Sequence, residues 1–158
     1  MPSIDIFAAF ERFQQYLNLP IEGDLTLMIL RGHLLIEEQV NFLIDNRVAK
    51  CGALKEADLT SFQKICLAEA IIEEFSPDGE DAWLWPAVKK LNKLRNDIAH
   101  NLTKPGIDER VADFVKRVPK KLDSSNFCHN FEFALWCTCV EVHLLIHAPD
   151  PSDFQNLP

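Results

Sequence analysis

The sequence predicts an all-α fold, in which four core helices form an antiparallel bundle and one or two further helices are added to it. Apolar residues recur at helical spacing, proline and glycine fall almost entirely between those stretches, and no stretch alternates as a strand does. With 158 residues, the chain has the length of one ordinary domain. We expect a single helical domain over residues 1–147 and a flexible tail at 148–158, which holds three of the nine prolines.

The first half of the chain predicts three helices, each bounded by residues that start or stop a helix. Residues 4–19 form the first, because their apolar side chains gather near one face before Pro20 and Gly23. That face carries Ile6, Phe7, Phe10, Phe13 and Leu17. Asp24 is the expected N-cap of a long second helix that ends near residue 48. A third helix spans about residues 58–75, where a Ser-Pro-Asp-Gly turn stops it.

Three more helices are predicted in the second half. The fourth covers about residues 81–102, with Pro86 tolerated in its first turns, and a Lys-Pro-Gly break follows. A short fifth helix covers about residues 108–118. After Pro119 and a serine-rich loop, the sixth runs over about residues 127–147.

The predicted second helix is apolar in nearly every direction, which is typical of a helix in the middle of a bundle. Arg31, Glu38 and Asp45 interrupt it at a spacing of seven residues and form a narrow polar stripe, with Asn41 beside it. One interpretation is an internal ion pair of Arg31 with Glu38 that stabilises packing. The other is that the stripe faces a functional cleft and helps to hold a cation from another helix. Either way its charged groups need partners, because desolvation of each costs several kcal/mol.

Composition indicates a globular protein of the cytoplasm rather than of a membrane or an exported class. Apolar residues make up 47% and charged residues 25% of the chain. No apolar run approaches the roughly 18 residues that a membrane span needs, and the N-terminus lacks the positive region of a secretory signal. Five cysteines are an odd number, so reduced thiols in a cytoplasm are the expected state.

The charge is unevenly distributed. The net charge of −8 argues against a surface that binds nucleic acid everywhere. Residues 86–121, however, hold ten of the sixteen basic side chains and four acidic ones, which makes this segment +6 and the remainder −14. The basic residues are Lys89, Lys90, Lys93, Arg95, Lys104, Arg110, Lys116, Arg117, Lys120 and Lys121. They are either ordinary solvated helix faces or a basic face suited to a polyanion.

The string Arg-Asn-Asp-Ile-Ala-His at residues 95–100 is the most informative feature of the basic segment. Arg95 falls within the apolar arc of its helix, so it reaches either inward to an acid such as Glu37 or Glu38 or sideways into a cleft. His100 lies about 140° round the helix from Arg95, whereas Asn96 and His100 are one turn apart and can touch. Arg95 and His100 can therefore act on one phosphate only through the long arginine side chain, a distorted helix end or a second copy of the helix.

At these residues the chain resembles the HEPN superfamily of helical-bundle proteins. Arg95, the polar Asn96 directly after it and His100 match the Arg-polar-x-x-x-His motif of that family, and they lie on a late helix, as the family's motif does. The long second helix with its Glu37-Glu38 pair is similar to that of HEPN domains in prokaryotic toxin and stress proteins. The resemblance of the bundle covers about residues 4–147.

The resemblance implies a metal-independent endoribonuclease that acts as a toxin or defence component, with the motif at the interface of a homodimer. His100 would exchange a proton with the ribose 2′-hydroxyl, because imidazole changes charge near neutral pH. Arg95 would stabilise charge on the phosphate, and Asn96 would orient His100 or the phosphate. RNA is the expected substrate and partner. The expected RNA-binding residues are Lys89, Lys93 and Lys104, and the expected supporting residues are Glu37, Glu38 and Arg31. No cofactor or metal is expected.

One position departs from part of the family. Some HEPN toxins carry a tyrosine two residues after the histidine, which an antitoxin can modify, and here that position is Leu102. An antitoxin protein is still a candidate partner, but one that modifies this position is not expected. Other HEPN-like domains are not nucleases, so the alternative is a non-catalytic interaction or regulatory domain in which Arg95 is a structural ion pair. A structural motif with an unrelated function is the third interpretation.

Two other groups of residues carry weaker signals. Cys139, His143 and His147 follow one another at one-turn spacing, which permits zinc, but no fourth ligand is matched to them, so packing and helix capping are favoured. His33 and Glu37 are also one turn apart, which favours a hydrogen bond in the core or at an interface. The three tryptophans, at positions 83, 85 and 136, are more typical of core or dimer contacts than of base stacking.

Overall fold

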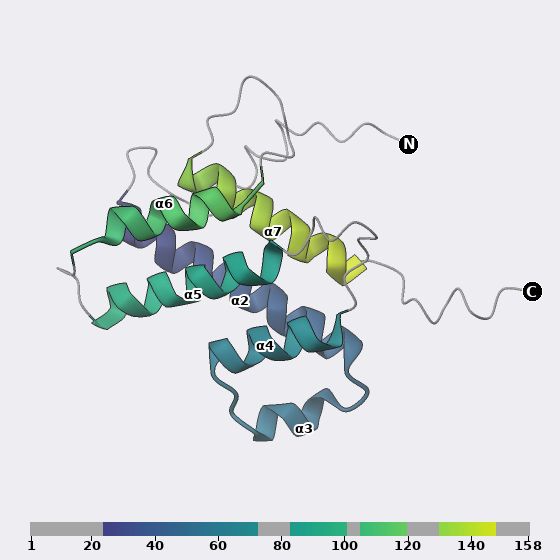
Figure 1. Cartoon of the computed structure of the whole chain (residues 1–158). Helices are drawn as coiled ribbons and strands as arrows, with labels where there is room; N and C mark the ends of the chain where they lie inside the picture. The colour runs from purple at the N-terminus through teal and green to yellow at the C-terminus, as the bar shows by residue number, and fades with distance from the viewer. Residues whose placement is uncertain (1–23, 73–82, 101–104, 120–129, 148–158) are drawn as a thin grey trace, which may run out of the picture.

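The computed structural model describes residues 24–72, 83–100, 105–119 and 130–147, and these form helices without any strand (Figure 1). The helices are α2 (Leu25–Arg47), α3 (Cys51–Glu56), α4 (Ser61–Ile71), α5 (Leu84–His100), α6 (Ile107–Arg117) and α7 (Phe131–His147). The predicted all-α bundle is therefore confirmed. The predicted first helix at residues 4–19 and the tail at 148–158 lie outside the described residues.

Helix α2 lies at the centre of the packing and contacts α4, α5 and α7. Helix α5 contacts α4 and α7 as well, and α6 packs against α5 and α7 (Figure 1). The short α3 buries none of its residues and lies at the edge beside α4. The bundle is thus built on α2, α4, α5 and α7, with α6 and α3 added to it.

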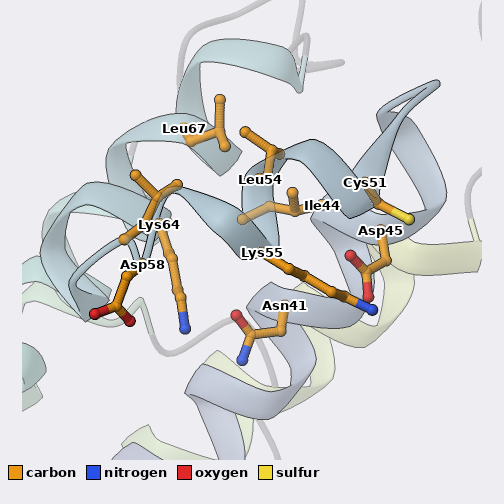
Figure 2. Close-up of a pocket in the computed structure, with 10 residues that line it drawn as sticks. Asn41, Ile44, Asp45, Cys51, Leu54, Lys55, Asp58, Lys64 and Leu67 are labelled. Carbon is orange, nitrogen blue, oxygen red and sulfur yellow. The ribbon is translucent and has the colours of Figure 1, made fainter.

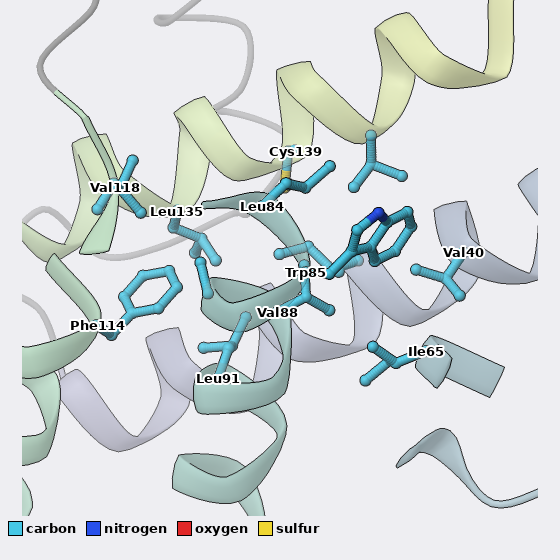
Figure 3. Packing of buried hydrophobic residues seen from close by; sticks show 14 of the residues in the cluster. Val40, Ile65, Leu84, Trp85, Val88, Leu91, Phe114, Val118, Leu135 and Cys139 are labelled. Atoms are coloured by element: carbon cyan, nitrogen blue, oxygen red, sulfur yellow. The ribbon is translucent and has the colours of Figure 1, made fainter. Parts of the chain in front are cut away.

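One continuous apolar core joins these helices (Figure 3). Trp85 of α5 is completely buried at its centre, between side chains of α2, α4 and α7. Phe114 of α6 and Leu135 of α7 are also completely buried, and Phe114 packs against Phe131 with 5.4 Å between the ring centroids. Trp83 and Trp136 are buried too, as the core interpretation of the tryptophans predicts.

The helix starts have local causes in the sequence. The side chain of Asp24 accepts hydrogen bonds from the backbone of Thr26 and Leu27, so Asp24 is the N-cap of α2, as predicted. Helix α4 begins later than predicted, because Thr60 and Gln63 form a capping box at its N-terminus. At the start of α7, Asn130 accepts a hydrogen bond from the backbone N–H of Phe133.

The short helix α3 was not predicted. Gly52 indicates a break in the sequence pattern, but it lies inside α3. Alanine, leucine, lysine and glutamate follow it at positions 53–56, and these favour a helix enough to offset one glycine.

Helix α2 is central, as predicted, but one side of it is exposed. Leu34 and Phe42 are 59% and 54% exposed, and Glu38 and Asp45 are exposed on the same side of the helix. Because Glu38 is in solvent, the polar stripe is not an internal ion pair between Arg31 and Glu38. Arg31 is half-buried.

The opposite side of α2 meets α7 closely at Gly32. A Cβ atom added at Gly32 would lie 2.3 Å from one methyl carbon of Leu135 and 2.7 Å from the other. The absence of a side chain at Gly32 therefore lets α2 and α7 approach each other. In the described part of the chain, no helix combines the length and apolarity that crossing a membrane requires.

Candidate functional site

Arg95 lies on α5 as a half-buried cation that has no carboxylate partner in the part of the chain that the structure describes. Its Nη1 donates a hydrogen bond to Oδ1 of the adjacent Asn96 at 2.9 Å. Among the described residues, no carboxylate lies within ion-pair distance of Arg95. Glu37, one expected inward partner, accepts a hydrogen bond from Ser61 at 2.6 Å instead, and Glu38, the other, is exposed. The structural ion pair considered for Arg95 is therefore not formed with either acid.

Asn96 connects the two ends of the motif. Helix α5 stays helical through His100, so Arg95 and His100 keep their separation of about 140° round the axis. Asn96 lies about 100° from Arg95 and 40° from His100. The hydrogen bond from Arg95 to Asn96 thus places the guanidinium beside an amide that shares the face of His100. In this structure Asn96 orients Arg95 rather than His100.

His100 itself is exposed at the last position of α5. Among the described residues it has no hydrogen bond to Arg95 or Asn96. The structure therefore brings Arg95 and Asn96 together, and it leaves the imidazole of His100 open to solvent on the neighbouring face.

The lysines predicted to bind RNA differ in their surroundings. Lys93 is exposed, and no carboxylate within the described ranges pairs with it. Lys89 forms an ion pair with Glu69 of α4, so its charge is partly balanced within the protein. Lys104 lies outside the described residues. On α5, Lys89, Lys93, Asn96 and His100 are spaced so that they form one stripe along the helix.

Two further ion pairs join α5 to α6 within the basic segment. Arg110 of α6 pairs with Asp97 of α5, and Lys90 of α5 lies 3.6 Å from a carboxylate oxygen of Asp113 on α6. Basic side chains of this segment thus serve partly in docking α6.

Beneath Arg95, α5 and α2 are joined by a buried polar contact. His33 is 3% exposed, and its Nε2 lies 3.0 Å from Oδ1 of Asn92, which is 4% exposed. Because an amide oxygen only accepts, Nε2 of His33 is the donor. On the other side of the imidazole, Nδ1 lies 3.8 Å from Oε2 of Glu37. Lys64 of α4 lies 3.8 Å from the other oxygen of Glu37, so the contact extends across three helices.

Burial lowers the pKa of His33 below the ordinary value of 6.5. The hydrogen bond with Asn92 and the charge of Glu37 oppose this shift, and the positive charge of Arg95 lowers the pKa further. Arg95 lies about one turn after Asn92 on α5, so its charge comes from the same part of that helix. The core hydrogen bond expected at His33 is present, but its partner is Asn92 rather than Glu37.

Asn92 was missed as a site residue in the sequence. One signal was available: it lies one turn after Val88 and one turn before Asn96, so it is a polar residue on a buried part of α5. Of the expected supporting residues, Glu37 takes part in the polar contact of His33. Arg31 lies about 160° round α2 from His33 and Glu38 is exposed, so neither joins it.

The cysteine and histidine residues of α7 do not converge. Burial raises the pKa of the Cys139 thiol strongly, and it raises the pKa of Cys137 to about 11. The imidazoles of His143 and His147 contact each other with 4.5 Å between ring centroids, outside the core. No group of three histidine, cysteine, aspartate or glutamate side chains in the described residues is arranged to hold a metal ion.

No family model, curated protein or solved structure matches this chain. The assignment of a function therefore depends on the residues of α5 and their surroundings.

Proposed function

We propose that this chain is a metal-independent endoribonuclease of the HEPN type, which cleaves RNA through the ribose 2′-hydroxyl as a toxin or defence component. The observation that carries the proposal is the state of Arg95. A half-buried guanidinium without a carboxylate partner among the described residues, held at 2.9 Å by Asn96, is ready for an external anion. A phosphodiester suits it, because the planar guanidinium donates two parallel hydrogen bonds to phosphate oxygens.

The proposed reaction needs one base and one cation near the scissile phosphate. His100 accepts the proton of the 2′-hydroxyl while the 2′-oxygen forms a bond to phosphorus. The bond from phosphorus to the 5′-oxygen breaks, and that oxygen takes up a proton. The products are a 2′,3′-cyclic phosphate and a 5′-hydroxyl. Arg95 stabilises the charge that develops on the phosphoryl oxygens.

A homodimer would bring an Arg95 and a His100 together although the two residues point in different directions on one helix. Because α5 is regular through His100, a bent helix end before that residue does not close the site. A two-fold contact along α5 would place each Arg95 near the other copy's His100, since such an interface is self-complementary. The second imidazole would then supply the proton for the leaving 5′-oxygen.

A non-catalytic domain is the alternative function. It is favoured by the contact beneath the site, where the charge of Arg95 acts on the buried His33. In this case Arg95 supports packing between α5 and α2, and His100 has no role.

The test compares cleavage of a short single-stranded RNA by the wild type, Arg95→Ala and His100→Ala. We expect losses on the order of 100-fold or more in both variants, and no cleavage when the RNA carries 2′-deoxyribose. The controls are Lys50→Ala and His143→Ala, which remove a cation and an imidazole from exposed positions outside the basic segment. Equal cleavage by all five folded proteins would overturn the catalytic assignment. No cleavage by any of them, with a lowered Tm in Arg95→Ala alone, would favour the non-catalytic domain.

A further inference from the structure

A cavity of about 340 Å³ lies between α2, α3 and α4, away from Arg95 and His100 (Figure 2). Pockets that bind small molecules measure roughly 300–1,000 Å³, so this one is at the lower end of that range. Its size fits a metabolite of about amino-acid size rather than a dinucleotide. Helix α3, which buries no residue of its own, forms one wall of it through Cys51, Leu54 and Lys55.

The cavity has an apolar end and a polar end. Leu54 and Leu67 face each other at one end, and the amide of Asn41 and the ammonium groups of Lys55 and Lys64 lie at the other (Figure 2). A ligand that fills it therefore needs an apolar part and a charged part.

The charges at the polar end balance one another. Lys55 and Lys64 supply two cations, and Asp45 and Asp58 supply two anions. Asp45, Lys55 and Asp58 form no ion pair with any other described residue. Lys64 has a carboxylate oxygen of Glu37 at 3.8 Å, which leaves room for a closer partner. A simple anion would meet two carboxylates here and a simple cation two ammonium groups, whereas a zwitterion satisfies both.

The geometry points to a binding site for a free α-amino acid with an aliphatic side chain. Its carboxylate would accept hydrogen bonds from Lys55, Lys64 and the amide of Asn41. Its ammonium group would donate to Asp45, and its side chain would pack against Leu54 and Leu67. This site is independent of the proposed RNA cleavage.

The probe is L-leucine, titrated into the full chain and followed by ¹⁵N chemical shifts and calorimetry. Two analogues keep the side chain but lose one charge: leucinamide lacks the carboxylate and 4-methylpentanoate lacks the ammonium group. We expect L-leucine to shift the amides of Asn41, Leu54 and Leu67, and both analogues to bind at least about tenfold more weakly. L-leucine should also slow alkylation of Cys51, which lines the cavity.

Variants then locate the two charges. Lys64→Met and Asp45→Asn should each weaken binding of L-leucine about tenfold or more, whereas Lys50→Met and Glu56→Gln, at exposed positions outside the cavity, should leave it unchanged. The proposal is overturned if folded protein shows no shift at these amides with L-leucine. It is also overturned if both analogues bind as well as L-leucine, or if Lys64→Met and Asp45→Asn bind like the controls.

Discussion

Nε2 of His33 on α2 donates a 3.0 Å hydrogen bond to Oδ1 of Asn92 on α5, and both residues are buried. This contact joins two core helices directly beneath the candidate site. It also links the stability of the bundle to the part of α5 that carries Arg95 and Asn96.

Loss of both partners of this hydrogen bond should lower the free energy of unfolding by less than the two single losses added together. We expect Asn92→Leu to lower the free energy of unfolding by about 1–3 kcal/mol, because the imidazole N–H of His33 is left buried without an acceptor. The double variant His33→Leu/Asn92→Leu should be destabilised by less than the sum of the single variants. Urea denaturation of the four proteins measures this, with the exposed Asn46→Ala as a control within about 0.5 kcal/mol of wild type. Additive effects of the two single changes would contradict a direct contact.

Stability should fall as the pH drops below the ordinary pKa of histidine. The folded pKa of His33 is lowered from 6.5, chiefly by burial, so between these two values the unfolded chain binds a proton that the folded chain does not. The contribution of His33 is therefore fully present above pH 6.5 and decreases as the pH falls toward the lowered folded value.

The variant His33→Gln tests this contribution, because its amide can still donate to Asn92 but does not titrate. We expect the free energy of unfolding to depend less on pH between about pH 5 and pH 7 than in wild type. The matched control is His143→Gln, at an exposed position of α7. Identical pH profiles for wild type and His33→Gln would rule out His33 as the titrating group.

Two glycines in helices should respond in opposite directions to the same substitution. Gly32→Ala places a Cβ 2.3 Å from a methyl carbon of the completely buried Leu135, so overpacking should lower the free energy of unfolding by about 1–3 kcal/mol. Gly52→Ala meets nothing within 4 Å, so it should raise stability by about 0.5–1 kcal/mol through helix propensity. Thermal unfolding of both variants measures the difference. An increase in Tm for Gly32→Ala would show that α2 and α7 are not in close contact there.

If the proposed RNA binding is correct, two neighbouring lysines of the α5 stripe should contribute unequally. Lys93 is exposed without a carboxylate partner among the described residues, whereas Lys89 is paired with Glu69. We expect Lys93→Gln to reduce the slope of log affinity against log salt by about 0.7, the value for one phosphate contact on a single strand, and Lys89→Gln to change it less. Fluorescence anisotropy of labelled single-stranded RNA measures the slopes, with the exposed Lys50→Gln as a control. A larger change for Lys89→Gln would contradict this order.

Local sequence accounts for most of the helices, because their ends depend on neighbouring residues. Asp24 caps α2 through hydrogen bonds to residues two and three positions away. The preference of proline and glycine for turns is equally local. The unpredicted helix α3 also has a local cause, because one glycine is a weak helix breaker among good helix formers. Helical spacing also places Arg95, Asn96 and His100 on α5 before any packing is considered.

Contacts between helices were decided only by the tertiary structure. Asn92 accepts a hydrogen bond from His33, 59 positions away, because of the way in which α2 and α5 cross. The spacing of residues within either helix does not predict this contact. The same holds for the pairing of Lys89 with Glu69 and for the cavity between α2, α3 and α4, because each depends on side chains from separate helices. The residues of the motif follow one another along one helix, so the sequence alone determines them. Which helix faces meet in the folded bundle decides that Lys93 is in solvent and that Arg95 has no carboxylate partner among the described residues.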